Sequence, residues 1–149
     1  MNPFDLKAAL LARHAQHVVL IHFPIALFIS SVAFDVIARF THSRSLARAA
    51  YYNLIGAAIM ALPAVVTGVL AWQLQLEGAK LRGNLRLHLA LGASSAVLIW
   101  LLAWWRKDQD RRDRGSLAAG YWAVAAIAVL VVALTGHLGG ILSGVEVPN

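Results

Sequence analysis

Four apolar runs, each about as long as a membrane is thick, constrain this chain more than any other feature. They cover residues 18–38, 51–72, 87–105 and 121–142. About 20 apolar residues in a helix cross the hydrocarbon core of a bilayer, where no water satisfies an open backbone. The sequence therefore predicts an all-α integral membrane protein. We expect a four-helix bundle in one domain, residues 1–149, with both termini on the same side of the membrane.

The composition excludes several classes of protein. Hydrophobic residues make up 60% of the chain and the mean hydropathy is +0.68, which is too apolar for a soluble domain of this size. Cysteine is absent, so disulfides, thiolate metal ligands and c-type haem attachment are excluded. No Ser-His-Asp arrangement and no phosphate-binding glycine loop is evident, so we assign no catalytic residue.

The basic residues predict the orientation of the spans. Eight lie in or beside the predicted links between runs one and two and between runs three and four, and five lie on the other side. Cytoplasmic loops carry the excess of Lys and Arg, so the two links are predicted to be cytoplasmic and both termini periplasmic. Charges that flank membrane spans indicate topology, and we predict no nucleic-acid partner.

Two further features flank the first span. Residues 1–16 are predicted to form an interfacial segment, because Asn2 can cap a helix and Pro3 suits its first turn. Asp35 is the one acid within a predicted span. Arg39 follows it by four residues, so we expect a local ion pair along one helix.

Histidine placement is the main chemical signal. Of the six histidines, all but His42 fall on the predicted outer side. His22, His88 and His137 come from three different spans at similar depth. Ionisable side chains within spans are costly and tend to be functional, and imidazole ligates both metal ions and haem iron. This set predicts a shared cofactor or metal site, and the alternative is a hydrogen-bonded cluster that locks the bundle.

Two segments resemble a known family. Residues 17–27 read His-Val-Val-Leu-Ile-His-Phe-Pro-Ile-Ala-Leu, and residues 135–140 read Thr-Gly-His-Leu-Gly-Gly. They resemble the opening and closing motifs of the bacterial membrane-protein family called domain of unknown function 2231. The resemblance implies that His17, His22 and His137 are the family's characteristic histidines, and His88 fits less closely. It also implies a multi-pass protein of the bacterial inner (cytoplasmic) membrane and a redox setting, since relatives are joined to electron-transfer domains.

The leading hypothesis is a membrane electron-transfer protein that binds b-type haem near the outer face. His22 and His137 are the expected axial ligands because both lie about one turn inside their spans. His88 would be a neighbouring donor or an alternative ligand, and His17 is a further candidate cofactor-binding residue. Arg82 and Arg86 precede His88 and could pair with the haem propionates. Two histidine ligands leave no open position on the iron, which favours electron transfer to a redox partner protein.

Other readings stay open. Copper or zinc could bind to His22, His88 and His137, which predicts a metal without a porphyrin spectrum. A chlorophyll-type pigment on histidine is a further alternative. The chain could instead be a non-catalytic structural subunit, whose partners are the lipid bilayer and either further copies of itself or a larger membrane complex.

Overall fold

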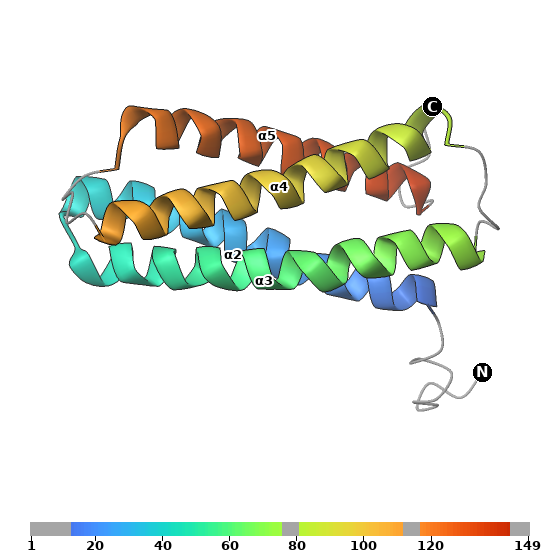
Figure 1. The fold of residues 1–149 in the computed structure, drawn as a ribbon, viewed down its shortest axis with the longest axis horizontal. Helices are drawn as coiled ribbons and strands as arrows, with labels where there is room; N and C mark the ends of the chain where they lie inside the picture. Colours follow the sequence, from blue (N-terminus) through green and yellow to red (C-terminus); the bar gives the residue numbers. More distant parts are fainter. Residues whose placement is uncertain (1–12, 76–80, 112–116, 144–149) are drawn as a thin grey trace.

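The computed structural model describes residues 13–75, 81–111 and 117–143, which form four long helices. These are α2 (Arg13–Thr41), α3 (Arg44–Gln75), α4 (Gly83–Arg111) and α5 (Ala119–Leu142). The helices run back and forth along one axis, and α2 begins at the end of the bundle where α5 finishes (Figure 1). Each contains a segment long and apolar enough to span a membrane. The predicted four-helix membrane bundle is confirmed.

The helices are longer than the apolar runs that predicted them. Of the predicted interfacial segment, residues 1–12 lie outside the described residues, and residues 13–16 begin α2. At the other end of the bundle α4 continues to Arg111. Arg106 is one of the eight basic residues that the orientation prediction assigned to the links. It lies within α4, so its assignment to a link is corrected.

The core is a seam of residues spaced by three and four along each helix, the spacing of helices that pack nearly parallel. Buried positions include Phe28, Ser31, Asp35 and Ala38 of α2, and Tyr121, Ala125, Ala128 and Val132 of α5. On α3 the buried seam is rich in alanine, which lets neighbouring helices approach closely. Large apolar side chains cover the outside of all four helices, as expected of a surface in contact with lipid.

The link between α2 and α3 has only two residues, His42 and Ser43. His42 takes a left-handed conformation with φ of 53°. Ser43 caps α3, since its Oγ accepts from the Leu46 N–H at 3.4 Å and its carbonyl accepts from the Ala47 N–H at 3.1 Å. The tight link makes α2 and α3 a close antiparallel hairpin. The second pair of helices that pack along each other is α4 and α5, which we call the second hairpin.

Candidate functional site

The first of two inward-facing histidines lies where α2 begins, at what we call the histidine end of the bundle. His17 has the same heptad position as the buried Ser31, so its ring faces α3. A Cβ on Gly68 would lie 2.9 Å from the His17 Cε1, so the ring rests on the α3 backbone. His17 Nδ1 is 3.2 Å from Thr67 Oγ1, which itself donates to the Pro63 carbonyl at 2.8 Å. The Thr67 oxygen therefore accepts from Nδ1, and Nε2 of a neutral His17 carries the lone pair.

His88 makes the equivalent contact in the second hairpin. It lies seven residues before the buried Ser95, and its ring packs against α5, where a Cβ on Gly139 would be 3.1 Å from the His88 Cε1. His88 Nδ1 is 3.1 Å from the Thr135 carbonyl, which can only accept. The Thr135 hydroxyl lies 3.2 Å from Ser95 Oγ and extends the polar contact between α4 and α5.

The two hairpins thus share one type of helix–helix contact. In each, a histidine of the first helix rests on a glycine of the second helix and forms a hydrogen bond beside it. The sequence singles out both histidines, but it did not predict that Gly68 and Gly139 contact them. The signal is the spacing: each glycine continues the three-and-four seam of its helix, from Ala64 on α3 and from Val132 on α5.

His22 and His137 are placed differently, because both side chains are exposed on the outside of the bundle. The His22 ring turns back on its own helix, with Nδ1 2.6 Å from the Val18 carbonyl. At about 1.5 Å of rise per residue, His22 lies about 9 Å along the span from Gln16, and His137 lies about 7.5 Å before Leu142. Both therefore lie at the histidine end, and their similar depth in the membrane stays a prediction.

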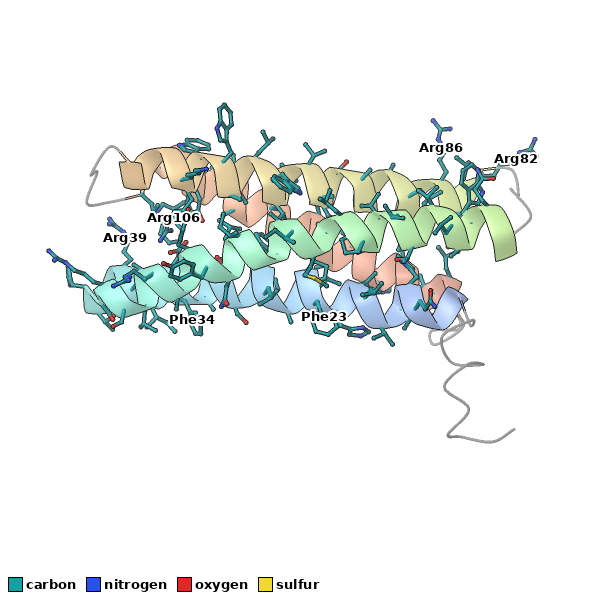
Figure 2. All side chains as sticks on the ribbon, turned by 60° about the horizontal axis from the view of Figure 1, so that its bottom comes forward. Phe23, Phe34, Arg39, Arg82, Arg86 and Arg106 are labelled. Atoms are coloured by element: carbon teal, nitrogen blue, oxygen red, sulfur yellow. The ribbon has the colours of Figure 1, made fainter. Side chains whose placement is uncertain are left out.

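Arg82 immediately precedes α4 and Arg86 lies in its first turn, also at the histidine end. Both side chains are exposed and project away from the bundle in Figure 2. Their proposed role toward a cofactor stays a prediction.

Metal binding by a histidine cluster gains no support from the arrangement. Within residues 13–75, 81–111 and 117–143, no group of three or more His, Cys, Asp or Glu side chains is placed to hold a metal ion. His88 packs on α5, whereas His22 and His137 face outward. The copper or zinc site on these three residues stays a prediction.

A second polar cluster lies at the opposite end of the bundle, which we call the ion-pair end. Arg106 Nη1 of α4 donates to Asp35 Oδ2 of α2 at 2.5 Å, and the Tyr121 hydroxyl of α5 donates to the same oxygen at 3.1 Å. Arg106 Nη2 donates to the Ala47 carbonyl of α3 at 3.0 Å. The cluster therefore joins all four helices.

The cluster is buried. Asp35 is 3% exposed, Arg106 8% and Tyr121 1%. The guanidinium also lies 5.9 Å from the centre of the Tyr121 ring. The predicted pair of Asp35 with Arg39 is wrong, because Asp35 occupies a seam position that faces inward, whereas the Arg39 side chain is exposed. The sequence did not single out Arg106 or Tyr121 as partners of Asp35. The available indication was that a carboxylate within an apolar bundle needs a compensating charge.

The comparisons with known proteins give one match. The model of a family described as predicted membrane protein, domain of unknown function 2231, matches residues 13–146. No curated protein and no solved structure matches the chain.

Proposed function

From the premise that this chain belongs to the family of predicted membrane proteins with domain of unknown function 2231, we propose that it is an electron-transfer protein that binds b-type haem. In this proposal His22 and His137, both exposed on the outside of the bundle at the histidine end, would hold the haem iron. Arg82 and Arg86 would pair with the propionates. The haem would supply a one-electron couple, and the chain would exchange electrons with a partner protein.

The observation that carries the proposal is the position of His22. Its side chain is exposed within an apolar span, beside the exposed Phe23, where a ring nitrogen without a hydrogen-bond partner is costly. Its Nδ1 donates to the Val18 carbonyl at 2.6 Å, so Nε2 of the neutral ring carries the lone pair that an iron ligand needs. Among the described residues no hydrogen bond satisfies that Nε2, which favours a partner from outside the chain.

His17 and His88 have a different role in this proposal. Each ring is confined between the helices of a hairpin, on Gly68 or Gly139, and its Nδ1 bonds the opposite helix. Such rings are suited to holding the helix pairs together. We therefore assign to them stability of the fold and not ligation of the iron.

The test is a spectrum of the full chain, expressed with an ample haem supply and purified in mild detergent. Oxidised and reduced absorption spectra and iron analysis should give a sharp reduced α-band and one haem per chain. His22→Ala and His137→Ala should each lose the band, whereas the matched His42→Ala, an exposed histidine at the ion-pair end, should keep it. Full haem occupancy in both ligand variants would make the assignment wrong.

The second candidate is a non-catalytic structural subunit of a membrane complex. The packing and hydrogen bonds of His17 and His88 between paired helices favour it. It predicts a folded protein without a Soret band or bound metal. Stoichiometric copper or zinc without a Soret band would instead favour the metal site. Either result overturns the haem proposal.

A further inference from the structure

A shallow groove on the outside of the bundle lies at the ion-pair end. Val36, Arg39 and Phe40 of α2 and Trp122 of α5 line it, with a volume of about 240 Å³. Three of the four lining side chains are apolar or aromatic, and the groove is widely open to its surroundings. It lies where α2 and α5 make less contact than the helices within each hairpin.

Arg39 is the one charged group in this groove. The only acid one turn away, Asp35, turns into the bundle and bonds Arg106 and Tyr121. Among the described residues, no carboxylate pairs with Arg39. Its guanidinium is exposed near the end of α2, as Figure 2 shows, and its charge is available to an anion from outside the chain.

The surroundings of the groove indicate which anion this is. The groove is smaller and more open than the pockets that enclose soluble small molecules, about 300–1,000 Å³. Since α2 is long and apolar enough to span a membrane, a groove beside its end would meet lipid tails along its apolar side and phosphates at its rim. A guanidinium binds phosphate by two parallel hydrogen bonds, and Trp122 suits the interfacial level.

We infer that the groove binds an anionic phospholipid, with the phosphate on Arg39 and an acyl chain along Val36, Phe40 and Trp122. This site is independent of the haem proposal, since it lies at the opposite end of the bundle and uses none of the histidines. A zwitterionic lipid should bind more weakly, because its positive headgroup opposes the charge of Arg39.

The test is native mass spectrometry of the full chain in mild detergent, titrated with phosphatidylglycerol or with phosphatidylcholine of the same acyl chains. The wild-type chain should retain one phosphatidylglycerol preferentially. Arg39→Gln should weaken that binding about fivefold, the factor for one arginine near a lipid headgroup. The matched Arg48→Gln removes an exposed arginine of α3, at the same end but outside the groove, and should leave the binding unchanged.

A second variant tests the apolar part of the site. Val36→Trp should fill the groove and reduce phosphatidylglycerol binding while Arg39 is kept. Circular dichroism should report the same helix content for all variants. Equal retention of the two lipids, full binding by Arg39→Gln, or equal losses in Arg39→Gln and Arg48→Gln would each overturn the inference.

Discussion

Arg106 of α4 donates to Asp35 of α2 at 2.5 Å, although 71 residues separate the two in the sequence. The pair lies inside the bundle, with side-chain exposures of 9% and 2%. A charge left in such a place without its partner is strongly unfavourable, whereas the pair as a whole can often be replaced by apolar side chains.

Asp35→Asn should therefore lower the free energy of unfolding by about 3–5 kcal/mol, because it leaves the Arg106 guanidinium buried without a carboxylate. The double variant Asp35→Leu, Arg106→Leu should recover much of that loss. Unfolding in mixed detergent micelles, followed by circular dichroism, measures both. The matched control is Arg39→Gln, which should change stability by no more than about 0.5 kcal/mol. A double variant no more stable than Asp35→Asn would contradict the prediction.

Tyr121→Phe should lower stability less than Asp35→Asn does. It removes one hydrogen bond to a carboxylate, which contributes about 1.5–3 kcal/mol. The ring keeps its edge contact with Trp105, whose centre lies 6.3 Å away. The same unfolding assay applies, with Tyr52→Phe as the control because Tyr52 is 63% exposed. Equal effects of the two substitutions would argue against the bond from Tyr121 to Asp35.

Gly139→Ala should destabilise the protein relative to Gly136→Ala. Both substitutions favour the helix by about 1 kcal/mol, but only the first places a Cβ against the His88 ring, 3.1 Å from Cε1. At Gly136 nothing lies within 4 Å of the added atom. Melting temperatures of the two variants, measured in one detergent, give the comparison. If Gly139→Ala is the more stable variant, the contact between the His88 ring and Gly139 is not tightly packed.

His42→Gly should raise stability by up to about 1 kcal/mol, because glycine takes a left-handed conformation without the clash of a Cβ. His42→Asn should be nearly neutral, since asparagine tolerates this region. His42→Val should lower stability. Thermal unfolding of the three variants checks this order, and a neutral His42→Val would show that the link between α2 and α3 readily changes its conformation.

The fold could be predicted from the sequence because four apolar runs of membrane length leave few alternatives. Which face of each helix points into the bundle and which points outward could not be predicted. In a span that is apolar all round, hydropathy does not distinguish the side that faces helices from the side that faces lipid. This is why His22 and His137, matched in depth with His88, were grouped with it, although the helices turn His88 inward and the other two outward.

The partner of Asp35 was missed for a related reason. The i,i+4 rule looks along one helix and found Arg39, whereas Arg106 comes from a helix two spans later. The spacing of buried positions shows why Asp35 pairs with Arg106 and not with Arg39. Asp35 follows Phe28 by seven residues and Arg106 follows Ile99 by seven, so both charges lie on seams of packed residues.

The distance in sequence between Asp35 and Arg106 also bears on how the protein is made. Chains grow at about 5–20 residues per second, so the 71 residues between them take about 4–14 s to synthesise. Throughout that interval Asp35 lacks the guanidinium that it contacts in the finished bundle. The cluster around Asp35 is therefore assembled in steps: α4 brings Arg106, and only α5, the last helix, brings Tyr121.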